Sequence, residues 1–168
     1  MACPQRQSVT PPDSGTEEDA ATMVALQHPS NGGVTADALV VSPGLGIGAV
    51  SLGMERSAIE HLGLTPTRSY LGGRFVEYGA LDVSYTDAAP GGVVSSVRVY
   101  VNRAMGGIRV SGATLPANTP YATLKEAIGA CGPAEHGESG EVTSCLGGSV
   151  EIVQSSLTND LRVGVRRQ

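Results

Sequence analysis

The chain contains no tryptophan, a single phenylalanine (Phe75) and five tyrosines, so aromatic side chains make up only 4% of its 168 residues. Its core must therefore be built from valine, leucine, isoleucine and alanine. A chain of this length forms one compact domain or two small halves that share a core.

Basic side chains are also few. Eleven Lys and Arg stand against sixteen Asp and Glu, which gives a net charge of −5. Binding to a phosphate backbone requires a basic stripe, so this balance argues against a nucleic-acid partner. No run reaches the roughly 18 apolar residues of a membrane helix, and no charged n-region precedes an apolar h-region. Any membrane contact would then depend on an N-terminal lipid anchor.

The N-terminal residues are rich in Pro, Ser, Thr, Asp, Glu and Gln and poor in large apolar side chains. Such a composition cannot offset the entropy cost of ordering the chain. We therefore predict a disordered tether over residues 1–37, with only a frayed helix inside residues 17–28.

Cys3 stands at the head of this segment, which is the arrangement of a mature bacterial lipoprotein. On this interpretation Cys3 carries the lipid, and Met1 and Ala2 are additions to the mature chain. A secreted or periplasmic chain without lipid and a cytosolic chain with an incidental cysteine are the alternatives.

The other two cysteines, Cys131 and Cys145, flank a turn-rich connection. We predict a disulfide between them, which requires an oxidising compartment. Two buried free thiols are the alternative. A zinc site has little support, because the two cysteines and the nearby His136 lack a fourth ligand at finger spacing. We expect neither a metal nor a cofactor.

The first half of the body, residues 38–113, reads as extended runs, one helix and several strands. The helix is predicted over residues 54–62, with Ala58, Ile59 and Leu62 on one face and Gly63 as its left-handed stop. Alternating apolar and polar residues predict that one sheet face is buried and the other is wet. Extended segments are predicted at residues 38–41, 45–52, 70–78, 81–85, 93–101 and 107–110, the last two forming a hairpin.

The second half, residues 114–168, begins with a helix start signal in which Thr119 is the N-cap and Pro120 the first helical residue. Strands are predicted at residues 141–145, 150–154 and 161–166. The string at residues 52–63 has a weaker echo at residues 119–129, and a glycine followed by an alternating strand comes after each. These features predict an α+β fold with two tandem units of a short helix and an antiparallel β-meander, which together form one compact domain.

One motif supports a family resemblance. Residues 46–63 read G-I-G-x-V-x-L-G-M-x-x-x-x-I-x-x-L-G, which resembles the opening of small bacterial lipoprotein modules of the BamE (SmpA/OmlA) type. It is also similar to the tandem fold of the β-lactamase inhibitory protein. Glu55 stands where these modules usually have Thr, and the second copy lacks the Gly-Met turn. A disulfide after the helix is likewise similar to the inhibitor family. The resemblance implies an envelope scaffold or binding module in the bacterial outer membrane or periplasm, or a secreted one.

A binding module of this kind would recognise a protein partner through a sheet face, an edge strand or the groove between its two units. Exposed aromatic side chains are the expected contacts, and core packing is the alternative for each of them. The candidates are Tyr70, Phe75, Tyr78, Tyr85, Tyr100 and Tyr121.

No catalytic motif is present. Ser57, Ser84 and Ser111 lack a G-x-S-x-G elbow, and the glycines of residues 43–48 lack the context of a dinucleotide loop. We therefore expect a non-enzymatic protein and name no catalytic residue. A small hydrolase or ligand-processing enzyme is one alternative, and an inhibitor of a secreted enzyme is another.

Overall fold

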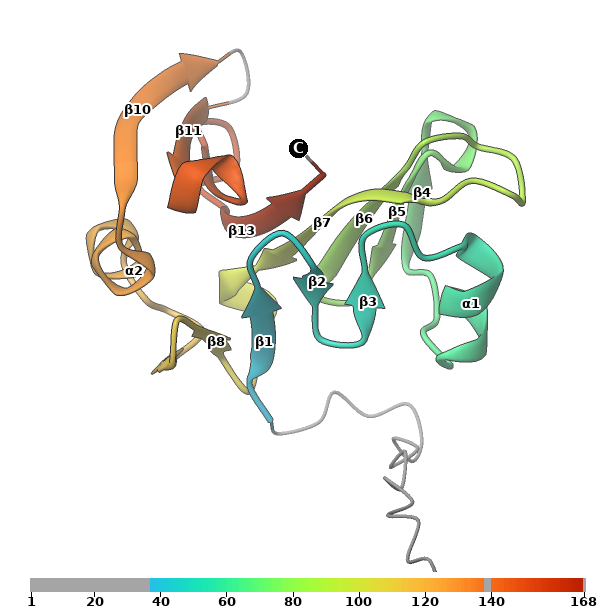
Figure 1. Ribbon diagram of the computed structural model, residues 1–168, viewed down its shortest axis with the longest axis horizontal. Helices are drawn as coiled ribbons and strands as arrows, with labels where there is room; N and C mark the ends of the chain where they lie inside the picture. Colours follow the sequence, from blue (N-terminus) through green and yellow to red (C-terminus); the bar gives the residue numbers. More distant parts are fainter. Residues whose placement is uncertain (1–36, 138–139, 168) are drawn as a thin grey trace, which may run out of the picture. The chain divides into compact units, whose positions relative to one another are not determined.

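The structure is a computed structural model, and it describes residues 37–137 and 140–167. The described chain is α+β: its regular structure consists mostly of strands, which form two sheets, together with two short helices (Figure 1). The predicted tether and the lipid site at Cys3 lie outside the described residues, apart from Asp37 at the end of the tether.

The larger sheet has eight strands, and every neighbouring pair is antiparallel. Their order is β10-β11-β12-β13-β7-β6-β5-β4, so each strand lies beside its neighbour in sequence except at the central β13–β7 pair. The strands are β4 (Arg68–Tyr70), β5 (Phe75–Tyr78), β6 (Leu81–Tyr85), β7 (Val94–Tyr100), β10 (Cys131–Gly137), β11 (Gly140–Cys145), β12 (Val150–Ser155) and β13 (Leu161–Arg166).

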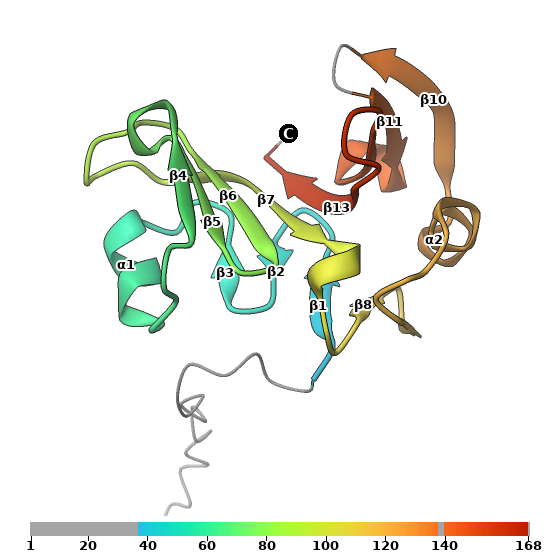
Figure 2. The ribbon, with the colours of Figure 1, turned by 180° about the vertical axis from the view of Figure 1, so that it is seen from behind.

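The smaller sheet has five short strands in the order β3-β2-β1-β8-β9. Its central pair, β1 and β8, is parallel, and the other pairs are antiparallel. Seen from behind in Figure 2, the chain leaves β7 through a short 3₁₀ turn and passes into β8 beside β1. The strands are β1 (Leu39–Ser42), β2 (Gly46–Ile47), β3 (Val50–Ser51), β8 (Ile108–Val110) and β9 (Ala113–Leu115).

Two helices complete the described elements: α1 (Arg56–His61) precedes β4, and α2 (Tyr121–Ile128) precedes β10. The predicted stop of the first helix is confirmed, because Gly63 has φ 71° and its N–H donates to the carbonyl of Glu60. Three 3₁₀ turns are η1 (Leu71–Gly73), η2 (Val101–Arg103) and η3 (Leu146–Gly148).

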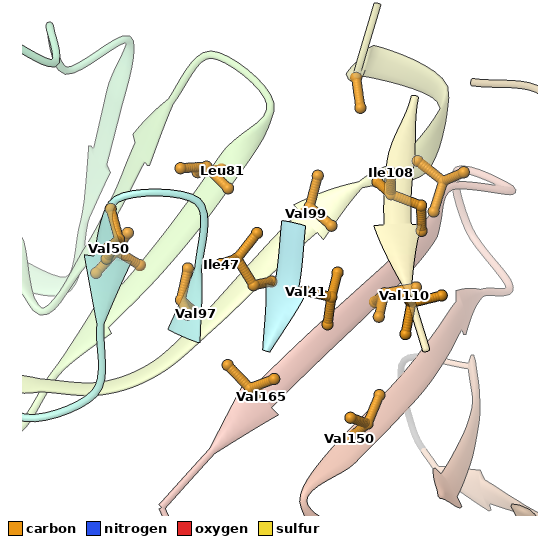
Figure 3. Close-up of a cluster of buried hydrophobic side chains, with 14 of the residues drawn as sticks. Val41, Ile47, Val50, Leu81, Val97, Val99, Ile108, Val110, Val150 and Val165 are labelled. Atoms are coloured by element: carbon orange, nitrogen blue, oxygen red, sulfur yellow. The ribbon is translucent and has the colours of Figure 1, made fainter. Parts of the chain in front are cut away.

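A single core joins both sheets and both helices. Figure 3 shows Val41 of β1 and Ile47 of β2 beside the β7 and β13 valines Val97, Val99 and Val165. All of these side chains are buried, and β2 contacts both β7 and β13. The core is almost entirely aliphatic, as the composition predicts. The side of the eight-stranded sheet that meets the small sheet is called the inner face below.

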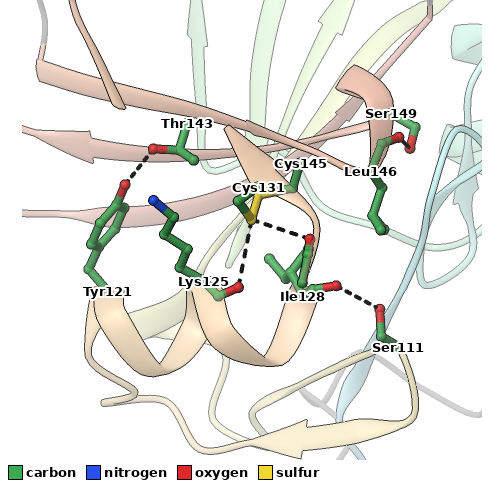
Figure 4. Close-up of a disulfide and its surroundings, with 10 residues drawn as sticks. Ser111, Tyr121, Lys125, Ile128, Cys131, Thr143, Cys145, Leu146 and Ser149 are labelled. Atoms are coloured by element: carbon green, nitrogen blue, oxygen red, sulfur yellow. Dashed lines mark hydrogen bonds between the residues drawn. A yellow bond between two sulfur atoms is a disulfide. The ribbon is translucent and has the colours of Figure 1, made fainter. Parts of the chain in front are cut away.

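The predicted disulfide is present in the structure (Figure 4). Cys131 on β10 is paired in register with Cys145 on β11, and the Cα atoms lie 3.9 Å apart. Cys145 is fully buried, whereas Cys131 is half-buried beside the carbonyl oxygens of Lys125 and Gly129. The bond therefore ties the end of α2 and the edge strand β10 to the rest of the sheet.

Residues 70–78 do not form the single strand predicted from their apolar content. The sequence Leu71-Gly72-Gly73 turns the chain, so that β4 and β5 pair as a hairpin. Gly72 has φ 66° and Gly73 φ 100°, conformations that favour glycine and that end an extended run.

The predicted hairpin between residues 93–101 and 107–110 is also wrong. β7 pairs with β6 and β13, whereas β8 crosses into the small sheet and pairs with β1 and β9. The reason is local, because η2 interrupts the extended chain immediately after Tyr100.

The second helix starts one residue later than predicted. Thr119 is not its N-cap, because the Thr119 hydroxyl donates to the carbonyl of Pro116 at 2.7 Å and closes the preceding turn. Pro120 keeps an extended ψ of 153° and occupies the cap position. The connection predicted after this helix is also structured, because residues 131–137 form the edge strand β10.

One turn recurs in sequence and in geometry. Residues 69–73 and 144–148 both read Ser-X-Leu-Gly-Gly. Leu71 and Leu146 have φ 48° and 51°, and the glycine that follows each has φ 66° and 67°. Both turns join antiparallel strands of the large sheet, β4 to β5 and β11 to β12. The repeat predicted from the sequence, residues 52–63 with residues 119–129, has a different spacing from these two turns and does not align them.

Candidate functional site

The outward side of the eight-stranded sheet is the candidate site, and we call it the outer face. Both helices and the small sheet pack on the inner face, and within residues 37–137 and 140–167 no helix or strand lies over the outer one. Strand alternation assigns its residues. They are Arg68, Tyr70, Phe75, Glu77, Asp82, Ser84, Ser96, Arg98, Tyr100, Glu135, Gly137, Gly140, Val142, Ser144, Glu151, Val153, Ser155, Arg162, Gly164 and Arg166.

A row of directly paired residues crosses this face from β4 to β11. Successive strands contribute charged or small residues in register, and the order is Arg68, Glu77, Asp82, Arg98, Gly164, Glu151 and Ser144. Arg68 with Glu77 and Asp82 with Arg98 are opposite charges directly across a strand pair, each worth a few tenths of a kcal/mol to about 1 kcal/mol, whereas Glu77 with Asp82 is a like-charge pair that opposes them. The row therefore places charged side chains on neighbouring strands across most of the width of the sheet.

Arg98 and Glu151 interact across an intervening strand. Both pair with Gly164 of β13, and Nε of Arg98 donates to Oε1 of Glu151 at 2.8 Å above it. Oε2 of Glu151 lies 3.7 Å from Nη1 of Arg166. Only 5% of the Glu151 side chain is exposed, whereas 53% of the Arg166 side chain is. The carboxylate therefore lies beneath the arginines that it holds.

Glu77 on β5 is the centre of a second cluster. Its Oε1 accepts hydrogen bonds from the hydroxyls of Tyr70 at 3.2 Å and Tyr100 at 3.1 Å. Its Oε2 accepts a bond from Nη1 of Arg103 at 3.3 Å. Such a buried carboxylate is stable only because several donors replace its lost hydration.

Two arginines lie over the Tyr100 ring. The guanidinium carbons of Arg103 and Arg162 are 3.8 Å and 4.9 Å from its centroid, which are cation–π distances. Burial raises the pKa of Tyr100 to about 12, since it disfavours the phenolate. The ring therefore stays neutral and provides a flat platform for the two guanidinium groups.

Asp82 on β6 is the most weakly paired of the three buried acids of the face, Glu77, Asp82 and Glu151. Its Oδ2 lies 3.9 Å from Nη1 of Arg162. Burial raises the pKa of Asp82, and the charges of Arg98 and Arg162 oppose that shift without reversing it. Nε of Arg162 is buried and has no hydrogen-bond partner in the described chain.

Asp160 lies at the rim of the face, where it accepts hydrogen bonds from Asn102 and Thr158 and lies 3.8 Å from Arg103. Partial burial raises its pKa, but the bonds from Thr158 and Asn102 and the charge of Arg103 outweigh this effect, and the net pKa is lowered. Asp82 and Asp160 therefore have opposite shifts on one surface.

The structure distributes the predicted contact residues among three environments. Tyr70, Phe75 and Tyr100 lie on the outer face, with Tyr70 exposed and Tyr100 buried beneath arginines. Tyr78 and Tyr85 are in the core, where their hydroxyls are hydrogen-bonded to each other at 2.9 Å. Tyr121 lies on α2 and bonds Thr143 of the inner face (Figure 4).

The arginines were not among the predicted contacts, which were all aromatic residues. The signal was available, since Arg68, Arg98, Arg162 and Arg166 occupy the polar positions of alternating strands. Alternation within one strand does not predict the order of the strands in the sheet. That order brings β13 of the second half beside β7 of the first.

Two shallow hollows lie near the turn between β12 and β13, and the strand residues Glu141, Gln154 and Leu161 that line them have the parity of the inner face. Their volumes are about 300 and 380 Å³, and Gln154 and Asn159 line both. The first is lined mainly by amide and hydroxyl side chains, and the second adds His136 and Glu141. Among the described residues that line these hollows, no serine or cysteine is hydrogen-bonded to a histidine.

Within the described ranges, no group of three or more His, Cys, Asp or Glu side chains is placed to hold a metal ion. The same residues include no helix with the length and apolarity needed to cross a membrane.

Comparisons with known protein families, with characterised proteins and with solved structures give no match to this chain. Any inference about its function therefore rests on the α+β fold with two sheets and on the geometry of the outer face.

Proposed function

We propose that this chain is a non-enzymatic binding module that recognises a protein partner through the outer face. We also propose that it consists of two tandem units, residues 38–113 and 114–168. In support, α1 precedes the meander β4–β7 and α2 precedes the meander β10–β13. The recurrent Ser-X-Leu-Gly-Gly turns agree with this duplication.

The observation that carries the proposal is the polar network on a sheet face over which no described helix or strand lies. Buried ion pairs contribute little net stability, because replacement by packed apolar residues is often neutral or stabilising. Stabilisation of the fold therefore does not by itself account for the buried acids Glu77, Asp82 and Glu151. Arginine and tyrosine, in contrast, are the residue types that dominate the energetics of protein interfaces.

We further propose that the protein works in a bacterial cell envelope or is secreted. The disulfide supports an oxidising compartment, and Cys3 is the proposed lipid site. The intact mass of protein expressed with its native upstream region tests this location. A diacylglyceryl mass on Cys3, together with a two-proton loss at Cys131 and Cys145, is expected, and an unlipidated chain with three free thiols contradicts the proposal.

Site-specific photocrosslinking in the source cells tests the function itself. A photoreactive phenylalanine analogue at Tyr70 or Ser144 places the probe on the outer face. The matched controls are Ser57 on α1 and Thr114 on β9, which are also exposed. We expect discrete protein adducts from the two outer-face positions only. Adducts of equal yield from all four positions, or from none, would contradict the proposal.

A further inference from the structure

The charges of the outer face are arranged in two layers. The carboxylates of Glu77, Asp82 and Glu151 are at least nine-tenths buried as side chains. The arginines extend above them, from Arg162 at 22% exposure to Arg166 at 53%. An approaching partner therefore meets guanidinium groups first, although the whole chain has a net charge of −5.

These guanidinium groups retain hydrogen-bonding capacity. Arg98 uses Nε for Glu151, and no other bond from this side chain exists within the described chain. Arg162 makes no side-chain hydrogen bond within the described chain and approaches Asp82 only to 3.9 Å; its Nε is buried, so Nη1 and Nη2 are the groups that remain for a partner. A carboxylate or a cation–π contact already holds each of these arginine side chains in place. Each therefore loses little side-chain entropy when a carboxylate of a partner accepts two hydrogen bonds from its remaining N–H groups.

We infer that the occupant of the outer face is an acidic segment of a partner protein, rich in Asp and Glu side chains. This inference rests on the proposed function and names the chemistry of its partner. Carboxylates fit the spaced, fork-shaped donors, and Tyr70 and Phe75 provide apolar contact between them. A nucleic acid fits less well, because its phosphate backbone requires a continuous basic stripe, whereas these arginines are separated by acidic side chains.

A competing occupant lies within the same sequence. Residues 13–19 contain Asp13, Glu17, Glu18 and Asp19, which form an acidic segment of this chain. The experiment therefore has to separate an external acidic ligand from this internal one.

The test is fluorescence anisotropy of the full chain with a labelled peptide of alternating Glu and Ser, compared with peptides of alternating Gln and Ser or Lys and Ser and with a single-stranded oligonucleotide. We expect saturable binding of the acidic peptide alone, weakened at least about tenfold when salt rises from about 0.05 to 0.5 M. The double variant Arg68→Gln/Arg166→Gln should lower affinity at least about fivefold. The control Arg109→Gln/Lys125→Gln removes the same charge from β8 and α2 and should leave affinity unchanged.

Both double variants change exposed or half-buried side chains, and their thermal unfolding curves verify folding before binding is measured. Equal losses in both double variants, or tighter binding of the oligonucleotide, would overturn the inference. A large gain in affinity after Glu17→Gln/Glu18→Gln would also overturn it by assigning the face to the chain's own segment. If crosslinks form at Ser144 but the acidic peptide does not bind, this inference fails and the proposed function stands. If neither occurs, the proposed function fails as well.

Discussion

Arg98 of β7 and Glu151 of β12 form an ion pair across a whole intervening strand, because the residue between them, Gly164 of β13, has no side chain. The Nε–Oε1 distance is 2.8 Å. A Cβ at Gly164 would lie 2.8 Å from Cγ of Arg98 and 3.1 Å from Cγ of Glu151. The glycine therefore creates the open space in which the two central charges of the outer face meet.

Gly164→Ala should consequently displace both side chains and lower the free energy of unfolding by about 1–3 kcal/mol, as overpacking does. Gly91→Ala is the matched control, because a Cβ there meets nothing within 4 Å. That control should change stability by less than about 1 kcal/mol. Urea unfolding of both variants measures the difference, and equal effects would show that Gly164 does not provide this space.

The opposite pKa shifts of Asp82 and Asp160 predict opposite pH dependences. The raised pKa of Asp82 means that the folded state keeps its proton longer, so its contribution favours folding at low pH and is lost as pH rises through the folded pKa. The lowered pKa of Asp160 gives a contribution that is present above the unfolded pKa and is lost as pH falls.

Urea unfolding between about pH 3 and pH 6 should separate the two. The stability of the wild type relative to Asp82→Asn should fall as pH rises, and its stability relative to Asp160→Asn should rise. If both differences changed in the same direction, the assignment of burial as the dominant effect at Asp82 would be wrong.

Loss of the disulfide should destabilise the second half of the chain. Cys131 and Cys145 are 14 residues apart, and the chain-entropy model gives roughly 3 kcal/mol for a loop of this size. Cys131→Ser/Cys145→Ser should therefore unfold at lower urea concentration. The wild type in a thiol reductant should reach the same midpoint, whereas an unchanged midpoint in both would contradict a structural role for the bond.

Packing between the two sheets depends on Ile47 of β2, which is fully buried against β7. Ile47→Ala should lower the free energy of unfolding by about 2–5 kcal/mol. Leu45→Ala is the control two residues away, because Leu45 is 69% exposed and should change stability by less than about 0.5 kcal/mol. Similar costs for the two variants would contradict the described packing.

The sequence predicted the elements whose signals are local. The first helix, its stop at Gly63, the strands around Leu81, Val97 and Val163, and the disulfide all follow from periodicity, glycine chemistry or cysteine spacing. It failed where a few residues overrode the pattern. Gly72 and Gly73 convert one apolar run into a hairpin, and Thr119 closes a turn where a helix cap was expected.

The candidate site was predicted less well than the fold. All six aromatic residues were candidate contacts with core packing as the alternative, and the structure has Tyr70, Phe75 and Tyr100 on the outer face but Tyr78 and Tyr85 in the core. Only the pairing of strands distant in sequence brings Arg98 beside Gly164 and Glu151. Such a row of residues cannot be read from any one strand.

Arginine footprinting of the complex tests the central claim, recognition of a protein partner through the outer face, most directly. The crosslinked partner, once identified, is mixed with the protein, and modification of each arginine by phenylglyoxal is measured by mass spectrometry with and without it. The account predicts protection of Arg68 and Arg166 on the outer face and unchanged modification of Arg109 on β8, which faces away from the core. Protection of Arg109 with full modification of Arg68 and Arg166 would contradict it.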